Sequence, residues 1–333
     1  MQIAELIRRL GVYVVLVLLI IAGSSQYASF LSGQNIGNIA TQAAPIVLTS
    51  LGQTFVLLTG EIDLSVGSIV SIVSVIVANG MAGRDSLVLP VLVLALLAGA
   101  LTGLVNGVLT TFFRIPSFIV TLATLLILQG INLVWTAGAP SSTLAPSFDG
   151  FTSQPILAIP FGAYVVVAAL LLAHFVLKKT YAGRLFFLIG SNPRAVHIAG
   201  LPVASIKTLA FVLSGLLAAC AGIFLTSYVG SGQSWLGAGM ELTAIAATVI
   251  GGTDLFGGRG TAAGAVGGGL LLTVIFNLLI FMGVASAYDP VATGAILLAG
   301  IGIYLASENP RNWRRTMHHA LVTVEHWLLR KHL

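Results

Sequence analysis

The sequence predicts an all-α membrane protein that crosses the bilayer about ten times. Three observations predict this polytopic fold class. Of the 333 residues, 57% are hydrophobic and only 8% are charged, whereas soluble domains carry about 25% charged residues. Apolar runs close to the roughly 20 residues that a helix needs to span a bilayer recur along the chain. The lysines and arginines also sort between alternate connections, as in multi-spanning proteins.

Ten candidate spans are bounded by polar residues, glycines or prolines. They cover residues 10–30, 36–58, 65–82, 87–112, 116–138, 156–177, 205–229, 238–252, 261–283 and 287–306. The first run also resembles a signal peptide, because Arg8 and Arg9 precede a short apolar core. We favour a retained helix, since no A-x-A cleavage pattern follows it. The chain then divides into an N-terminal segment with the first span (1–35), a core (36–306) and a basic cytoplasmic tail (307–333).

The charge distribution predicts the orientation. Alternating the connections between two sides places 14 of the 15 lysines and arginines on one side, and only Arg84 on the other. The larger set comprises Arg8, Arg9, Arg114, Lys178, Lys179, Arg184, Arg194, Lys207, Arg259, Arg311, Arg314, Arg315, Arg330 and Lys331. By the positive-inside rule this side is the cytoplasm, so both termini are expected there. The lysines and arginines of the cytoplasmic connections explain the net charge of +5, so this charge does not indicate a nucleic-acid partner.

The longest connection on the basic side, residues 178–207, predicts a short helix outside the membrane. Ser191 or Asn192 can cap its start, Pro193 suits its first position, and Gly200 suits the residue after its end. We interpret residues 193–199, which include Arg194 and Ala195, as a helix that docks into a groove on a partner. A plain connector is the alternative.

Polar, uncharged residues follow one face of the second span. Five of them are spaced 3, 4, 7 and 4 residues apart, which places them on a single helical face: Asn35, Asn38, Gln42, Thr49 and Gln53. Such a face should avoid lipid, because polar side chains in hydrocarbon cost free energy. We interpret it, together with Asn106 of the fourth span, as the lining of a path for a neutral polar solute. Hydrogen bonding between helices is the alternative.

The distribution of charge also bears on the energy source. No lysine or arginine falls mid-span and no acid is clearly placed there, whereas carriers driven by protons or sodium usually hold such acids. The chain has no G-x-x-x-x-G-K-[ST] phosphate loop. If ATP drives transport, ATP and Mg²⁺ are therefore expected on another subunit, with no cofactor or metal in this chain. A membrane enzyme would need a clustered catalytic set, which we do not find in the sequence.

Two stretches share the pattern G-x-x-D-L-x-x-G: GEIDLSVG at 60–67 and GGTDLFGG at 251–258. We predict a helix break at each, as in transporters with duplicated halves; chance is the alternative for so short a match. The first break includes Glu61. Either Asp63 or Ser65 is expected to cap the helix that follows this break, because the macrodipole favours an acid at a helix start. The second break holds Asp254 and ends near Arg259.

Four stretches resemble a known family, the inner-membrane permeases of ribose/xylose/galactose-type ABC sugar importers, which also include autoinducer-2 transporters. They are LTGEIDLSVGSIVSI, GLVNGVLTTFFRIPSFIVTLATLLILQGI, GRLFFLIGSNPRAVHIAGLPVASIK and ELTAIAATVIGGTDLFGGRGTAAGAVGG. The resemblance covers residues 36–306 or so. This chain departs from the family pattern at Glu61, where glycine is frequent, and at Phe256, where a small residue is common.

The resemblance implies a type II ABC importer-like permease of the bacterial inner membrane that imports a neutral monosaccharide or a related small polar solute. It implies a second permease copy, identical or paralogous, two cytoplasmic ATPase subunits and a periplasmic sugar-binding protein. It also implies that residues 193–199 form the coupling helix. The alternative is a stand-alone secondary carrier or facilitator for a small polar solute.

Overall fold

The computed structural model describes residues 2–141, 143–157 and 159–308, and these residues are mostly helical. The α-helices are α1 Gln2–Gln26, α2 Gly33–Leu58, α3 Val66–Met81, α4 Val88–Thr111, α5 Ser117–Thr136, α6 Phe161–Lys179, α7 Tyr181–Ser191, α8 Pro193–Ile198, α9 Val203–Val229, α10 Met240–Ile250, α11 Ala262–Phe281 and α12 Asp289–Glu308. Short 3₁₀ turns lie at η1 Asp85–Leu87, η2 Phe151–Ser153 and η3 Ser286–Tyr288. Strands β1 Pro155–Ile156 and β2 Ile159–Pro160 form an antiparallel hairpin in which Ile156 pairs with Ile159.

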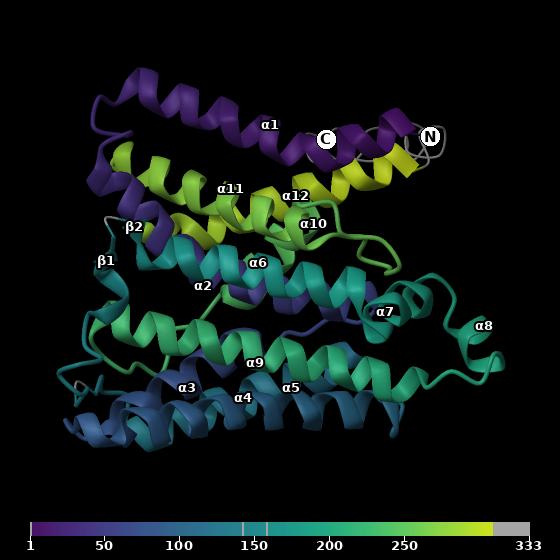
Figure 1. The fold of residues 1–333 in the computed structure, drawn as a ribbon, viewed down its shortest axis with the longest axis horizontal. Helices are drawn as coiled ribbons and strands as arrows, with labels where there is room; N and C mark the ends of the chain where they lie inside the picture. The colour runs from purple at the N-terminus through teal and green to yellow at the C-terminus, as the bar shows by residue number, and fades with distance from the viewer. Residues whose placement is uncertain (1, 142, 158, 309–333) are drawn as a thin grey trace, which may run out of the picture.

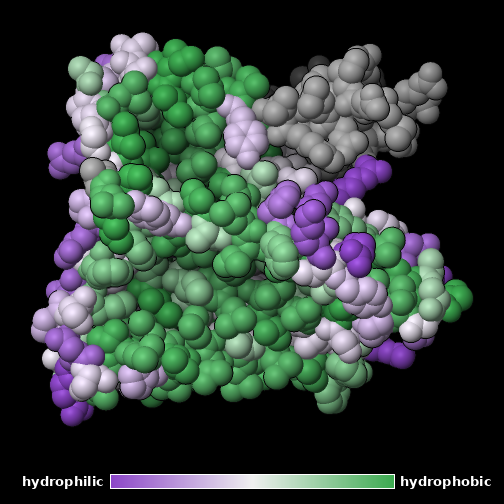
Figure 2. Space-filling view, in the orientation of Figure 1, coloured by the Kyte–Doolittle hydropathy of each residue, from purple (hydrophilic) through white to green (hydrophobic). Residues whose placement is uncertain are grey.

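The long helices run roughly along the long axis of the molecule, as Figure 1 shows. Helices α7 and α8 lie at one end of the long axis, the end at which α1 starts, and the β1–β2 hairpin lies at the opposite end. Figure 2 shows a face that is apolar over most of its length, with hydrophilic residues gathered towards the two ends. This distribution is typical of a helical membrane protein, in which an apolar band faces lipid.

Six helical segments in the described part of the chain are long and apolar enough to cross a membrane: Gly33–Leu58, Asp85–Thr111, Ser117–Thr136, Phe161–Lys179, Val203–Val229 and Ala262–Phe281. Three shorter apolar helices accompany them: Gly11–Gln26, Val66–Met81 and Met240–Ile250. At 1.5 Å per residue, the 11 residues of α10 extend only about 17 Å, well short of the roughly 30 Å hydrocarbon core. A helix is thus confirmed within each of the ten predicted spans, whereas ten crossings stay a prediction.

The predicted boundaries were wrong in three places. Helix α1 begins at Gln2 rather than near residue 10. The span predicted at 156–177 begins as a helix only at Phe161, because Pro155 and Pro160 belong to the hairpin that precedes it. Helix α7 was not predicted, although Thr180 caps it by accepting a hydrogen bond from the Gly183 amide (3.0 Å). Most of the predicted tail 307–333 lies outside the described residues.

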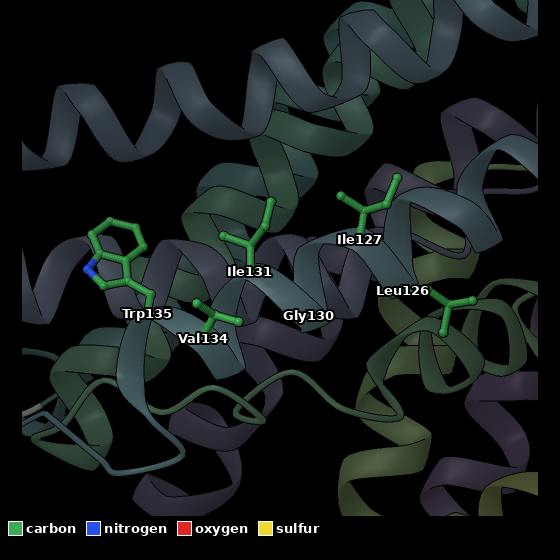
Figure 3. A pocket seen from close by; sticks show the side chains of 6 residues that line it. All are labelled: Leu126, Ile127, Gly130, Ile131, Val134 and Trp135. Carbon is green, nitrogen blue, oxygen red and sulfur yellow. The ribbon is translucent and has the colours of Figure 1, made fainter.

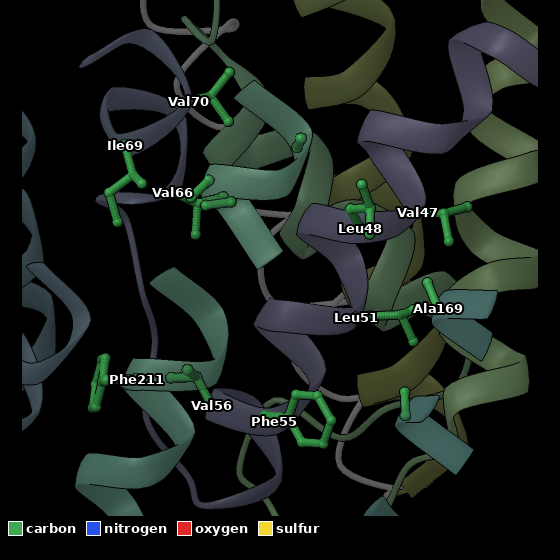
Figure 4. Packing of buried hydrophobic residues seen from close by; sticks show 14 of the residues in the cluster. Val47, Leu48, Leu51, Phe55, Val56, Val66, Ile69, Val70, Ala169 and Phe211 are labelled. Atoms are coloured by element: carbon green, nitrogen blue, oxygen red, sulfur yellow. The ribbon is translucent and has the colours of Figure 1, made fainter. Parts of the chain in front are cut away.

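Helix α2 is the centre of the bundle. In its apolar window 89% of residues are buried inside the protein, against 22% in the corresponding windows of α4, α5 and α6. Figure 4 shows part of the core, where Leu51, Phe55 and Val56 of α2 lie among side chains of α3, α6 and α9. The outer helices therefore leave most of their surface exposed, and α2 and α3 pack almost entirely against protein.

Glycines allow α4 and α9 to pack closely. Gly99, Gly103 and Gly107 face the backbone of α9, and a Cβ atom at Gly103 would overlap the Phe211 carbonyl. Helix α11 uses the same device against α10, where a Cβ atom at Gly268 would overlap the Ala247 carbonyl. These small-residue contacts let helix backbones approach closely, which is the usual basis of helix packing in membranes.

Candidate functional site

The segment between α2 and α3, residues 59–65, is the helix break that the sequence predicts. Helix α2 ends at Leu58, and Gly60 follows with a φ of +79°, a backbone conformation that favours glycine. Asp63 Oδ1 accepts hydrogen bonds from the Ser65 amide (2.9 Å) and the Ser65 hydroxyl (2.6 Å). Asp63 is therefore the acid at the start of α3. Ser65 is the N-cap residue of α3, but its side chain makes no capping hydrogen bond, because its hydroxyl donates to Asp63 instead.

Asp63 is also the centre of a buried polar cluster. Its second carboxylate oxygen accepts a hydrogen bond from the Ser214 hydroxyl of α9 (2.8 Å). The Asn106 amide of α4 donates to the Ser65 hydroxyl (2.8 Å) and accepts from the Thr124 hydroxyl of α5 (2.6 Å). These contacts join the helix break to three other helices.

Gln53 of α2 completes this cluster through the backbone of Asp63. In the amide orientation that satisfies both groups, Gln53 donates to the Asp63 carbonyl (3.0 Å) and accepts from the Asp63 amide (3.3 Å). The buried polar cluster thus comprises Gln53, Asp63, Ser65, Asn106, Thr124 and Ser214. All except Thr124 have no exposed surface. Such a satisfied network holds its members in one arrangement, because any unpaired group in it would be costly.

The polar face of α2 divides into two parts. Gln53 is buried in the cluster, Thr49 donates to the Pro45 carbonyl of its own helix (2.9 Å), and Asn35 exchanges two hydrogen bonds with Asn277 of α11 (3.0 and 2.9 Å). Asn38 is exposed and Gln42 is half-buried, and neither has a hydrogen-bond partner among the described residues. Asn35, Thr49 and Gln53 thus make hydrogen bonds between helices or within their own helix, as the alternative interpretation expects.

Two acids pack within the bundle, one in the first break and one in the first turn of α10, and neither lies in the middle of a helix. Asp63 is fully buried. Glu241 lies in the first turn of α10, where its Oε1 accepts a hydrogen bond from the Gly239 amide (3.2 Å). A Cβ atom at Gly67 of α3 would overlap the other oxygen of Glu241. The first turns of α3 and α10 therefore lie against each other.

The second break, 251–260, repeats the local geometry of the first. Asp254 Oδ1 accepts a hydrogen bond from the Phe256 amide two residues on (3.0 Å), as Asp63 does from Ser65. The Asp254 amide donates to the Arg259 carbonyl, which closes the loop (2.9 Å). Thr261 then caps α11 by accepting from the Gly264 amide (2.9 Å). The matching turns agree with the sequence repeat, and an internal duplication stays a prediction.

A further irregular segment, residues 230–239, was not predicted to enter the bundle. It packs along α3, where the Ser74 hydroxyl accepts from the Gln233 amide (3.2 Å) and the Ser71 hydroxyl accepts from the Gly237 amide (2.9 Å). Serine side chains thus satisfy backbone groups that no helix pairs. Irregular backbone at membrane depth requires such protein partners. The glycines and serines of the stretch GSGQSWLGAG were the available sequence signal.

The short helix α8 forms where it was predicted. Asn192 caps it by accepting from the Ala195 amide (3.0 Å), Pro193 is its first residue, and Gly200 follows it with a φ of +74°. Of its apolar residues, Val196 is buried, whereas Ile198 is 85% exposed at the end of the molecule that carries α7. The sequence does not indicate which apolar residue of this helix points outward, so the exposure of Ile198 could not be predicted from it.

A hollow on the outer surface of α5 has a volume of about 470 Å³ (Figure 3). Its lining is Leu126, Ile127, Gly130, Ile131, Val134 and Trp135. The lining is almost entirely apolar, so the hollow does not suit a polar solute. Groups of His, Cys, Asp or Glu that could hold a metal ion are absent from the described part of the chain.

Comparison with known proteins shows the family to which the chain belongs. Residues 35–301 match the model of the family described as "Branched-chain amino acid transport system / permease component". A probable ABC transporter permease of Sinorhizobium fredii (strain NBRC 101917 / NGR234) is 35% identical over 297 residues, 89% of each chain. The chain belongs to this family of ABC transporter permeases. As a permease it is a multi-pass, non-enzymatic membrane subunit, and its family implies ATP-binding subunits and a substrate-binding protein as partners.

Other relatives of the permease have names that state a substrate. The ribose import permease protein of Bacillus subtilis (strain 168) is 39% identical over 296 residues, which are 88% of this chain and 92% of the relative. The autoinducer 2 import system permease protein of Enterobacter sp. (strain 638) is 36% identical over 271 residues, which are 81% and 78% of the two chains. The resemblance to monosaccharide and autoinducer-2 permeases is thus confirmed. No solved structure matches the chain significantly.

Proposed function

We propose that this permease forms the membrane path by which an ABC importer moves a neutral monosaccharide, or a related small polar solute, into the cytoplasm. The observation that carries this proposal is the similarity to ribose and autoinducer-2 permeases across more than four fifths of the chain. The polar residues on α2 support it, because Asn38 and Gln42 offer amides, which suit hydroxyl groups.

The proposed assembly follows from the family and the charge pattern. The permease pairs with a second copy, identical or paralogous, with two cytoplasmic ATPase subunits that hold ATP and Mg²⁺, and with a periplasmic binding protein. It lies in the bacterial inner membrane, crosses it ten times and has both termini in the cytoplasm. The short helices α3 and α10, with the irregular segments before them, supply two of these crossings. Helix α8 is the coupling helix that docks on the ATPase.

Site-directed labelling tests this orientation. With Cys220 replaced by alanine, a cysteine at Ser147 is expected to react with an impermeant maleimide from the periplasm, and a cysteine at Ala195 only from the cytoplasm. Both positions are exposed, Ala195 in α8 and Ser147 in the segment that leads from α5 to the β1–β2 hairpin, and α8 and the hairpin lie at opposite ends of the molecule. The Cys220→Ala protein without a new cysteine is the control for background labelling. Labelling of Ala195 from the periplasm would reverse the topology.

The two parts of the α2 polar face predict different mutant effects. Gln42→Leu is expected to lower transport severalfold without loss of assembly, because Gln42 has no partner in the described chain that would be left unpaired. Gln53→Leu leaves the Asp63 amide and carbonyl unpaired in a buried site, at about 1–3 kcal/mol for each group, so it should reduce the stability of the fold. Uptake assays and thermal unfolding in detergent measure the two effects. Wild-type uptake by the Gln42→Leu protein would remove this residue from the path.

A stand-alone facilitator was the alternative interpretation of the sequence, and no observation on the structure or the relatives favours it. Proteoliposomes that contain only this chain distinguish the two candidates. We expect them to retain preloaded radiolabelled ribose as well as protein-free liposomes do, because an importer permease needs its ATPase to open the path. Rapid equilibration of ribose in the absence of any other subunit would favour the facilitator.

A further inference from the structure

The end of α7 lies directly against both helix breaks. The Gly258 amide of the second break donates to the Leu58 carbonyl at the end of α2 (3.0 Å). A Cβ atom at Gly190 of α7 would overlap both of these groups. A Cβ atom at Gly257 would lie within 3.0 Å of backbone atoms of Gly60 and of Gly190. The backbones of α7, of the first break and of the second break are therefore in contact immediately before α8 begins.

The helix that follows α8 is tied to the first break by two side-chain contacts. Lys207, in the second turn of α9, forms an ion pair with Glu61 (2.5 Å), and both side chains are largely buried, with 16% and 17% of their surface exposed. Ser214, seven residues further along α9, donates to Asp63 in the buried polar cluster (2.8 Å). Residues seven apart lie on the same helical face. One face of α9 thus holds the break at two points.

The connection between α8 and α9 is short and closed by backbone hydrogen bonds. It contains only residues 199–202. The Leu201 amide donates to the Val196 carbonyl (3.2 Å), and the Val203 amide donates to the Leu201 carbonyl (2.9 Å). A displacement of α8 would therefore be carried into α9 rather than taken up by a slack loop.

We infer that the Glu61–Lys207 ion pair transmits movement of the α7–α8–α9 segment to the first helix break, and through it to the buried polar cluster. Glu61 and Lys207 are then positioning residues for coupled transport. This inference rests on the proposed function of the chain as an ATPase-driven permease. An ion pair suits the task, because removing one partner leaves a largely buried charge without compensation. The ion pair would therefore oppose any movement of α9 that leaves the first break in place.

Charge reversal tests the inference in the complete transporter, reconstituted with its ATPase and binding protein. Glu61→Lys and Lys207→Glu each place like charges together and are expected to lower the ribose transported per ATP hydrolysed by about fivefold or more. The double swap Glu61→Lys with Lys207→Glu restores opposite charges and should recover most of this ratio. Lys179→Met is the matched control, because Lys179 is an exposed lysine at the same end of the molecule. Its ratio should equal that of the wild type.

The outcomes separate this inference from the proposed function. Wild-type transporter that shows no ATP-dependent uptake would overturn the proposed function itself. If the wild-type transporter is active and both single variants transport as much ribose per ATP as the wild type, the inference is overturned and the proposed function stands. A lower ratio of transport to ATP hydrolysis in both single variants, with no recovery in a double variant that assembles with the ATPase, would also overturn the inference. The two residues would then act separately. Restored coupling in the swap supports it, since a general structural defect would not be reversed by a second charge reversal.

Discussion

Ile198→Asp is expected to abolish ATP-driven uptake while the protein still inserts into the membrane and folds. Ile198 is 85% exposed on α8 and makes little contact within the chain, so the substitution should not disturb the bundle. In the docked complex it would lose the burial of an isoleucine side chain, about 2 kcal/mol or roughly 30-fold in affinity for the ATPase. A carboxylate placed in an apolar groove adds a further penalty.

Co-purification of the ATPase with the permease, and ATP hydrolysis stimulated by the loaded binding protein, measure this effect. Leu157→Asp is a matched control, because Leu157 is an apolar residue with 88% of its surface exposed at the opposite end, in the β1–β2 turn. It should leave ATPase binding unchanged. Ala195→Trp should also weaken docking, by its bulk on the same helix. Normal ATPase binding and coupling in both α8 variants would show that α8 is not the coupling helix.

Asp63→Ala is expected to destabilise the fold more than any other single change in the buried polar cluster. The Asp63 carboxylate accepts three hydrogen bonds from Ser65 and Ser214 in a site without exposed surface. Alanine leaves these donors without a partner, and each buried unpaired group costs about 1–3 kcal/mol. The side-chain cavity adds to this cost. We therefore expect a loss of several kcal/mol in the free energy of unfolding and poor yield of folded protein.

Two milder variants make this prediction specific. Asp63→Asn keeps the shape of the side chain, and one oxygen can still accept a hydrogen bond, so it should fall between the wild type and Asp63→Ala. Ser214→Ala removes one donor and leaves the Asp63 bonds to Ser65, so its effect should be about 1 kcal/mol. Thermal unfolding in detergent ranks the four proteins. Equal stability of Asp63→Ala and the wild type would mean that the cluster does not hold the break.

Local chemistry explains what could be predicted from the sequence. The start and end of α8 depend on Asn192, Pro193 and Gly200, whose effects reach only a few residues, so the helix was predicted within one residue of its observed end. The helix breaks at Asp63 and Asp254 were likewise detectable, because aspartate bonds to the amide two residues on in both. The main helices could be predicted because each is encoded by one continuous apolar run in the sequence.

The polar cluster could not be predicted, because its members come from four different helices and the first break. Spacing placed Gln53 on a polar face of α2, and hydrophobicity placed Asn106 inside a span, yet neither observation indicates that both contact the residues of one break. Ser214 could not be predicted as a member of the cluster, since a single serine in an apolar run carries no sequence signal. The ion pair between Glu61 and Lys207 joins residues 146 positions apart, which only the tertiary packing of α9 brings together.

Uptake of radiolabelled ribose into proteoliposomes tests the central claim most directly. The vesicles would contain this permease with its cytoplasmic ATPase, with the binding protein outside and ATP with Mg²⁺ inside. The account predicts accumulation against a gradient that requires the permease, the ATPase, the binding protein and hydrolysable ATP together. Accumulation or rapid equilibration of ribose by the permease without the ATPase or ATP would contradict it.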